Sequence, residues 1–210
     1  MAHNNTGELE SAYRRRKKEI KERLREFSRL PESEWFYELC FCLCTPQSNA
    51  KKCDSAVKEL KEKDFRRRNV RPGSTLMGNV RFHNNKARYL IRAKNGFAVI
   101  KAKIREYKDG RKKDPKELRE WLVDNVKGMG MKEASHFLRN TGFRGLAILD
   151  RHILKNMKEY GGVSAVPDTL TKKEYLRLEK QLRSFSEKIG IDMDELDLLF
   201  WSLETGEVFK

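Results

Sequence analysis

Apolar residues recur at helical spacing along most of the chain. They return every three or four positions over residues 8–29 and again over residues 84–107. That spacing places the apolar side chains on one face of a helix. The pattern predicts further helices over residues 34–44, 51–62, 114–126, 171–189 and 192–203, with an irregular segment over residues 65–77.

Capping residues mark where several of these helices begin. Asp114 is followed by Pro115 and, three positions on, by Glu117. A cap, a proline in the first helical position and an acidic third residue together favour a helix start. Pro46 suits a first helical position in the same way. No segment alternates as a strand would, so we expect an all-α protein.

The charge of the chain points to an anionic partner. The 210 residues carry a formal net charge of +15. Such an excess favours nucleic acid, although a basic surface that only keeps the protein soluble is the simpler alternative. No apolar run reaches the length of a membrane span, and the amino terminus lacks a signal-peptide pattern. A cytoplasmic protein is therefore expected.

Four cysteines lie close together, within residues 40–53. They are Cys40, Cys42, Cys44 and Cys53. Their spacing lacks the paired C-x-x-C pattern of a structural zinc site. Reduced and mostly buried thiols are the better interpretation.

A glycine-rich turn separates two of the predicted helices. Gly128 and Gly130 allow positive φ, and the helix that begins near Met131 points its first N–H groups at whatever lies before the turn. Orphan donors and the positive end of a helix dipole suit a phosphate. A hairpin of this kind would bind the nucleic-acid backbone without reading bases.

A lysine and an aspartate near this turn are candidates for catalysis. Lys132 lies in the first turn of the second helix, where the dipole and a dry cleft would disfavour its ammonium and suit a reactive amine. Asp150 precedes His152 at a predicted helix start, so it is expected to cap that helix. In the simpler alternative, Lys132 is solvated and Asp150 is only a cap.

The spacing of these residues resembles a known group of repair enzymes. Gly-x-Gly-x-Lys, with Asp150 eighteen positions beyond Lys132, resembles the helix–hairpin–helix DNA glycosylases of the endonuclease III superfamily. The strings KEASHFLRN and DRHIL resemble more specifically the archaeal-type 8-oxoguanine DNA glycosylases. The resemblance extends over residues 34–210.

This resemblance implies a DNA repair enzyme that acts in base excision repair on double-stranded DNA containing 8-oxoguanine. Lys132 would displace the base and form a Schiff base, and β-elimination would then cleave the strand, so the enzyme would be both a glycosidase (a hydrolase) and a lyase. Asp150 would stabilise the positive sugar. The resemblance also implies a monomer in a prokaryotic, nucleoid-associated setting.

The resemblance also bears on cofactors. No cysteine follows Cys53, so the iron–sulfur cluster of endonuclease III cannot form. No redox or organic cofactor is expected. The family's hairpins often hold a Na or K ion on backbone carbonyls, which here would be those of Asp124, Val126 and Met129.

Three residues match positions that probe DNA in the superfamily. Gln47 would fill the hole left by the flipped base, because its amide both donates and accepts; the alternative is an exposed capping glutamine. Phe82 would wedge between stacked bases, and Arg81 would meet a base edge or a phosphate. The alternative for Phe82 is a core aromatic.

Three residues near the carboxyl end would line the base pocket. Asp197 and Trp201 are four positions apart on a predicted helix, so they share a face. Trp201 would stack on the base and Asp197 would accept from its edge. The terminal carboxylate of Lys210 would accept from the N7–H that distinguishes 8-oxoguanine. The alternatives are core packing for Trp201 and a surface charge for Asp197.

The predicted architecture has two helical lobes with an active-site cleft between them. Residues 31–135 would form a central domain that ends in the hairpin, and residues 1–30 with 136–210 a second domain. Two other functions stay open. One is a glycosylase of the same superfamily for another base, such as an oxidised pyrimidine. The other is a non-catalytic helix–hairpin–helix module that binds DNA.

Overall fold

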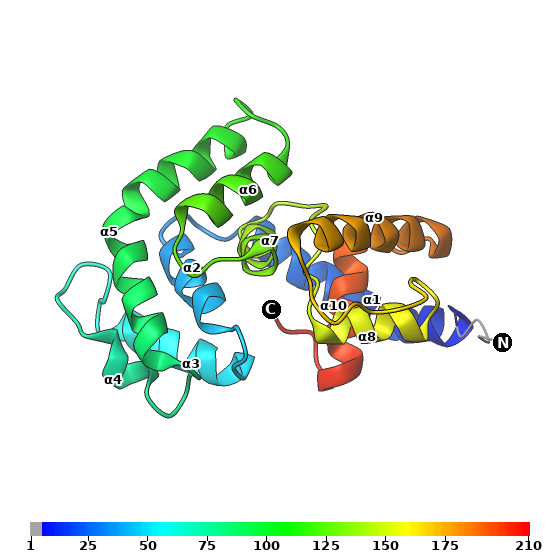
Figure 1. Cartoon of the computed structure of the whole chain (residues 1–210), viewed down its shortest axis with the longest axis horizontal. Coiled ribbons are helices and arrows are strands. Elements are labelled where there is room, and N and C mark those ends of the chain that lie inside the picture. The colour runs from blue at the N-terminus through cyan, green and yellow to red at the C-terminus, as the bar shows by residue number, and fades with distance from the viewer. Residues whose placement is uncertain (1–5) are drawn as a thin grey trace. The chain divides into compact units, whose positions relative to one another are not determined.

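The computed structural model describes residues 6–210, and every regular element among them is a helix (Figure 1). The all-α prediction is therefore confirmed for this part of the chain. The helices, in order, are α1 Thr6–Ser28, α2 Trp35–Cys44, α3 Ala50–Glu62, α4 Pro72–Leu76, α5 His83–Lys108, α6 Pro115–Asn125, α7 Met131–Asn140, α8 Arg151–Glu159, α9 Lys172–Ile189 and α10 Met193–Thr205.

The chain forms two compact units. One comprises Leu30–Phe137, and the other combines Met1–Arg29 with Leu138–Lys210. That these units are the two predicted domains, with a cleft between them, stays a prediction.

Helix α2 is the centre of the unit formed by Leu30–Phe137. All ten of its residues are buried, including Cys40, Cys42 and Cys44. A helix that is apolar all round needs partners on every side, and α3 and α5 pack against it (Figure 1). The three cysteines and Cys53 are buried, reduced thiols, as the sequence predicts.

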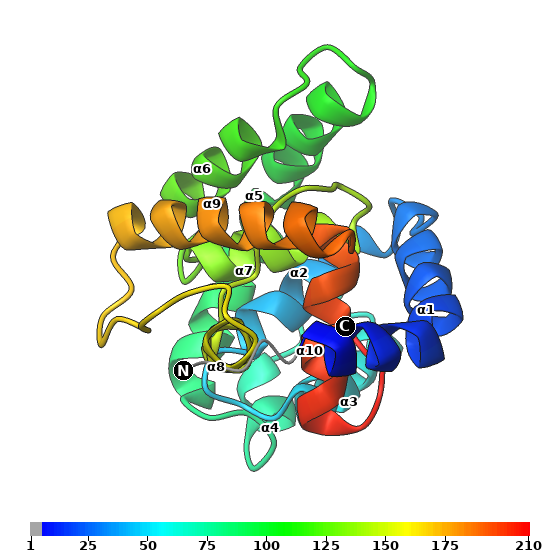
Figure 2. The ribbon, with the colours of Figure 1, turned by 90° about the vertical axis from the view of Figure 1, so that its right-hand side faces the viewer.

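In the other unit α10 has the corresponding role. It packs against α1, α8 and α9, so the amino-terminal helix and the carboxyl-terminal third share one core (Figure 2). Leu196, Leu198, Leu199 and Phe200 of α10 are inaccessible to solvent. These contacts fix the helix that carries Asp197 and Trp201.

Local capping chemistry sets most of the helix starts. The Asp114 side chain accepts from the Lys116 N–H at 2.9 Å, and Thr171 accepts from Glu174 N–H at 3.3 Å. The Asp114 cap confirms a prediction, and Thr171 caps a helix that begins where the sequence predicts. The expectation for Pro46 is wrong, because α3 begins at Ala50 with Asn49 as its cap. Residues 65–77 also contain a five-residue helix, α4, in a segment predicted to be irregular.

None of the helices between residues 6 and 210 is long and apolar enough to cross a membrane.

Candidate active site

The turn between α6 and α7 depends on one glycine. Gly128 has a φ of +92°, and a Cβ at this position would collide with the ring of Tyr89 on α5. Glycine is therefore required for both conformation and space. Gly130 does not use the positive φ that a glycine allows.

Gly130 has a different role, because its N–H donates to the Glu133 carboxylate at 3.2 Å. Glu133 stands three positions after Gly130, the place of the acidic residue in a capping box. It therefore satisfies one of the donors at the start of α7. The amides that remain for a phosphate are those that follow Gly130.

Lys132 is the second residue of α7, as predicted. Its ammonium lies 3.2 Å from Oε1 of Glu133, and its side chain is one quarter exposed. Glu133 thus holds the turn with one oxygen and the lysine with the other. The amine is neither fully solvated nor free to rotate without losing this ion pair.

Asp150 caps α8, which confirms the structural part of its prediction. Its Oδ1 accepts from the N–H groups of His152 and Ile153 at 2.8 and 3.0 Å. Two charge-assisted bonds to one oxygen hold the carboxylate in a defined orientation. Oδ2 takes no part in the cap, so it stays available for a positive charge.

Asp197 is not a surface charge. It is 7% exposed and its Oδ2 lies 2.5 Å from Nη1 of Arg139, which is 3% exposed. Burial raises the pKa of Asp197 to about 7, while the attraction of Arg139 acts in the opposite direction. One of the two carboxylate oxygens is thus committed within the protein. Its predicted contact with a base stays a prediction.

Replacing Asp197 with alanine is expected to lower the free energy of unfolding by about 3–5 kcal/mol, because Arg139 would stay buried without its counter-ion. Chemical denaturation measures this change. The exposed Asp168 supplies the control; its alanine variant should differ from the native chain by no more than about 0.5 kcal/mol. Equal effects of the two substitutions would contradict a structural role for the pair.

Trp201 lies beside the helix that Asp150 caps. Its ring meets that of His152 edge-on, with centroids 5.5 Å apart. The indole Nε1 is buried and has no hydrogen-bond partner among residues 6–210. His152 is held in turn by Glu204, whose carboxylate lies 3.7 Å from Nδ1. The orientation of Trp201 therefore depends on contacts along α8 and α10.

The segment after α10 turns back at a glycine. Gly206 has a φ of +86° and donates its N–H to the Ser202 carbonyl at 2.9 Å. Val208, beyond this turn, is buried. Lys210 is partly buried. The contribution of its carboxylate to a base pocket stays a prediction.

The three proposed DNA probes are all exposed on the unit formed by Leu30–Phe137. Phe82 is 51% exposed with a φ of +57°, so it is not a core aromatic. Gln47 is exposed with a φ of +54°, and Asn49 rather than Gln47 caps α3. Arg81 is exposed, with its guanidinium 4.9 Å from the centroid of the Phe82 ring. The alternative of a core aromatic is therefore wrong for Phe82, whereas Gln47 is exposed, as its alternative also held, but does not cap α3.

The comparison with known proteins decides the family. The model of the 8-oxoguanine DNA glycosylase family matches residues 20–191, which is most of the chain. The chain belongs to this family.

Members of the 8-oxoguanine DNA glycosylase family match the chain over nearly its whole length. The Fusobacterium nucleatum 8-oxoguanine DNA glycosylase/AP lyase is 40% identical, over 97% of this chain and 96% of that protein. The crystal structure of the Thermotoga maritima 8-oxoguanine DNA glycosylase has a TM-score of 0.84 at 34% identity, covering 98% of each chain.

A third relative was solved with DNA. The Methanocaldococcus jannaschii 8-oxoguanine glycosylase/lyase, in complex with a 15mer DNA containing 8-oxoguanine, has a TM-score of 0.83 at 34% identity. It covers 98% of this chain and 99% of that one.

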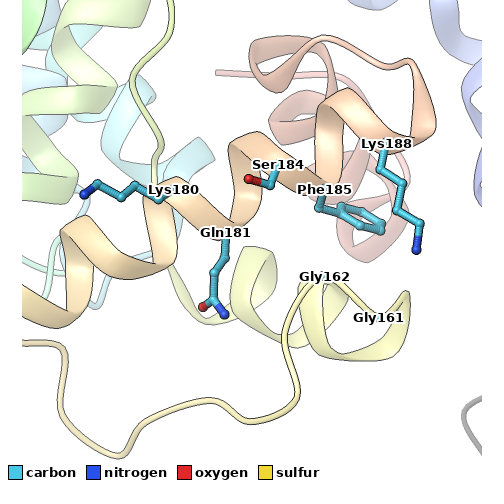
Figure 3. A pocket seen from close by; sticks show the side chains of 7 residues that line it. All are labelled: Gly161, Gly162, Lys180, Gln181, Ser184, Phe185 and Lys188. Atoms are coloured by element: carbon cyan, nitrogen blue, oxygen red, sulfur yellow. The ribbon is translucent and has the colours of Figure 1, made fainter.

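The shallow hollow beside α9 contains none of the residues predicted for the glycosylase site. Its volume is about 310 Å³. Phe185 packs over Gly162 at its floor, and Lys180 and Lys188 point away from each other (Figure 3). Gly161, Gln181 and Ser184 complete the lining. No carboxylate lines this hollow, so it lacks the groups that the chemistry needs.

Metal ligands do not cluster in the described part of this glycosylase. No group of three or more His, Cys, Asp or Glu side chains between residues 6 and 210 is placed to hold a metal ion. At the hairpin, the Val126 carbonyl accepts from the Met129 N–H at 3.1 Å. A Na or K ion on the carbonyls of Asp124, Val126 and Met129 stays a prediction.

Sequence reasoning missed two residues of the site, Glu133 and Arg139. Glu133 could have been found, because an acidic residue three positions after a helix-starting turn is a capping signal. Arg139 gave no local signal, since its partner Asp197 lies 58 positions away.

Proposed function

We propose that the protein is a bifunctional DNA repair enzyme that excises 8-oxoguanine and cleaves the resulting abasic site. The observation that carries this proposal is Lys132, an amine at the start of α7 directly behind a glycine turn, in a chain of this family. The names of the relatives, 8-oxoguanine DNA glycosylase/AP lyase, support both activities. The complex of the Methanocaldococcus jannaschii relative with DNA containing 8-oxoguanine supports the assignment of this substrate.

Recognition begins on double-stranded DNA, which a monomer binds through its basic surface. The net charge of +15 favours this association. A base inside the stack is out of reach of the lysine, so the damaged nucleotide must leave the duplex. Phe82 separates the neighbouring bases, Arg81 contacts the DNA beside it, and Gln47 fills the vacated position. The exposure of all three supports this assignment.

The hairpin between α6 and α7 would hold the DNA backbone. Gly128 lets the chain turn tightly enough for a phosphate to approach the amides at the start of α7. The N–H of Gly130 donates to Glu133, so the amides of Met131 and Lys132 are the donors for that phosphate. A Na or K ion on the carbonyl side of the turn would strengthen the same contact.

Base excision uses Lys132 and Asp150. The neutral amine forms a bond from Nζ to C1′ of the flipped nucleoside, and the C1′–N9 bond breaks with its electron pair leaving on the base. The base then takes up a proton. The Asp150 carboxylate stabilises the positive charge that develops on the sugar, and its two bonds from the α8 amides keep it oriented before the reaction begins.

The amine that displaced the base also cleaves the strand. Opening of the sugar gives a Schiff base between Nζ and C1′. A proton then leaves C2′, and the bond from C3′ to its phosphate oxygen breaks by β-elimination. Only an amine can form this intermediate, so the lyase step requires Lys132 but no base in the pocket. Neither step needs a redox or organic cofactor.

The base pocket would combine Trp201, Asp197 and the carboxylate of Lys210. Trp201 offers a ring for stacking, and its unpaired Nε1 adds a donor. The free oxygen of Asp197 accepts from the base edge, while Arg139 holds the other. The acceptor at Lys210 would meet the N7–H of 8-oxoguanine, which guanine lacks.

The native chain is expected to cleave a duplex with a single 8-oxoguanine and to leave undamaged guanine intact. Borohydride should reduce the Schiff base and trap a covalent protein–DNA adduct, visible as a shifted band on a denaturing gel. A matched duplex with an oxidised pyrimidine is the comparison. Excision of the pyrimidine alone would favour the other glycosylase specificity. Binding without excision or adduct would leave a non-catalytic DNA-binding module.

A further inference from the structure

The ammonium of Lys86 is buried in the unit formed by Leu30–Phe137. Lys86 lies in the first turns of α5 and is 4% exposed. Its Nζ donates to the carbonyls of Cys44 and Pro46 at 2.7 and 2.6 Å, and to Ser48 Oγ at 3.0 Å. All three acceptors are neutral. A cation is costly to bury without a counter-ion, so this arrangement needs a reason beyond stability.

The three acceptors surround Gln47. The Pro46 carbonyl precedes it, the Ser48 hydroxyl follows it, and the Cys44 carbonyl ends α2. Gln47 has a φ of +54°, a conformation that a non-glycine residue keeps only where its surroundings impose it. The bonds from the buried Lys86 ammonium supply that constraint, while the Gln47 side chain stays exposed.

The same lysine is connected to the turn that carries Phe82 through Ser48. The Arg81 N–H donates to Ser48 Oγ at 2.9 Å, whereas the bond from the Lys86 N–H to the Phe82 carbonyl at 3.1 Å is an ordinary backbone bond of the helix start. Ser48 is thus the acceptor shared by Lys86 and the Phe82 turn. Phe82 also has a positive φ, +57°. Two exposed residues in unfavourable conformations are therefore tied to one buried ammonium.

We propose that Lys86 is a positioning residue that, through Ser48, locks the loop of Gln47 and the turn of Phe82 into one rigid DNA probe. The inference rests on the proposed function, because it requires that these residues enter the duplex. Because Gln47 and Phe82 are held at a fixed distance from each other, Phe82 separates the stacked bases and Gln47 fills the hole in a single movement. The loop and the turn are already ordered before DNA binds. No conformational entropy is therefore lost in ordering them while the damaged nucleotide leaves the duplex.

The burial of Lys86 separates this role from backbone binding. A lysine that is only 4% exposed does not contact a DNA phosphate, so it releases no counterion from the DNA. Burial lowers the pKa of Lys86, Cys44 and Cys53 act in the opposite direction, and the charges of Lys132 and Glu133 oppose each other. The three short bonds therefore hold a cation that burial disfavours, which fits a residue kept for its donors.

The test compares Lys86→Met and Ser48→Ala with Lys94→Met. Methionine keeps the stem of Lys86 and removes all three donors. Ser48→Ala leaves the ammonium in place and removes the shared acceptor, together with the hydroxyl's 3.4 Å bond to the Pro46 carbonyl. Lys94 lies on the same helix, is partly exposed, donates to the Arg68 carbonyl at 2.7 Å and has its ammonium 5.1 Å from the centroid of the Phe65 ring. Lys94→Met therefore matches the loss of one positive charge.

Two substrates and one spectroscopic signal distinguish positioning from folding. Single-turnover excision from an 8-oxoguanine duplex is expected to fall about tenfold to a hundredfold in Lys86→Met and Ser48→Ala. Cleavage of a single-stranded abasic oligonucleotide, which needs no extrusion, should be unchanged. The fluorescence rise of 2-aminopurine beside the lesion, which reports unstacking, should be lost. The slope of affinity against salt should stay that of the native chain.

Several results would overturn the proposal. Equal losses on both substrates would make Lys86 a merely structural residue, and a native fluorescence rise in Ser48→Ala would show that the shared acceptor does not matter. If Lys86→Met does not fold, Ser48→Ala alone decides. If the native chain leaves 8-oxoguanine intact, the proposed function is refuted. If the native chain is active and the variants excise 8-oxoguanine as fast, only the role of Lys86 is refuted.

Discussion

The Lys132→Gln variant is expected to form no borohydride-trapped adduct and to leave an abasic strand uncut. The reason is chemical, since a Schiff base requires an amine and the amide of glutamine is not a nucleophile. Glutamine is similar in size and has good helix propensity, so α7 should form as before. The measurement is the yield of adduct after reduction, with binding to the same duplex followed in parallel.

Lys127→Gln is the matched control for this variant. Lys127 is an exposed lysine five positions earlier in the hairpin, and its replacement removes the same charge. Its adduct should form normally. One positive charge among 46 lysines and arginines contributes little to the overall field, so both variants should still bind DNA. An adduct with Lys132→Gln would identify another amine as the nucleophile.

The Asp150→Asn variant is expected to fold normally and to excise 8-oxoguanine about 10²–10³-fold more slowly, the usual cost of losing one preorganised electrostatic group. Asparagine is as good a helix cap as aspartate, so the bonds to His152 and Ile153 should survive. Only the charge is removed. Single-turnover excision and the thermal unfolding midpoint are measured on the same preparation.

Asp192 offers a control with the same cap geometry. Its carboxylate Oδ1 accepts from the N–H groups of Asp194 and Glu195 at the start of α10, as Asp150 does at the start of α8. Asp192→Asn should leave excision unchanged. Near-normal excision by Asp150→Asn, or a fall in melting temperature without slower excision, would reduce Asp150 to a cap.

The parts of the fold that depend on neighbouring residues could be predicted from the sequence. The caps at Asp114, Asp150 and Thr171 involve partners two or three positions away. The glycine turn is read in the same way, although Gly130 takes an ordinary conformation and serves as a donor to Glu133. Helix α4 was missed because five residues provide too little periodicity to detect.

Contacts between distant parts of the chain could not be predicted. Lys86 reaches acceptors 38 to 42 positions before it, and in the sequence it is one basic residue in a basic segment. The Arg139–Asp197 pair has no local signal either, because its members lie 58 positions apart. Burial of a charge is a property of the assembled core and leaves no local pattern.

The four buried cysteines have a consequence for the cell in which the protein works. Burial raises the pKa of Cys44 to about 12 and that of Cys53 to about 11, and raises that of Cys40 as well. Peroxide attacks the thiolate, and it must reach the sulfur to do so. Oxidative stress is the condition that produces 8-oxoguanine. The core of the proposed repair enzyme therefore keeps the thiols of Cys40, Cys44 and Cys53 protonated and shielded when its substrate accumulates. The stress that creates the lesion need not inactivate the enzyme that repairs it.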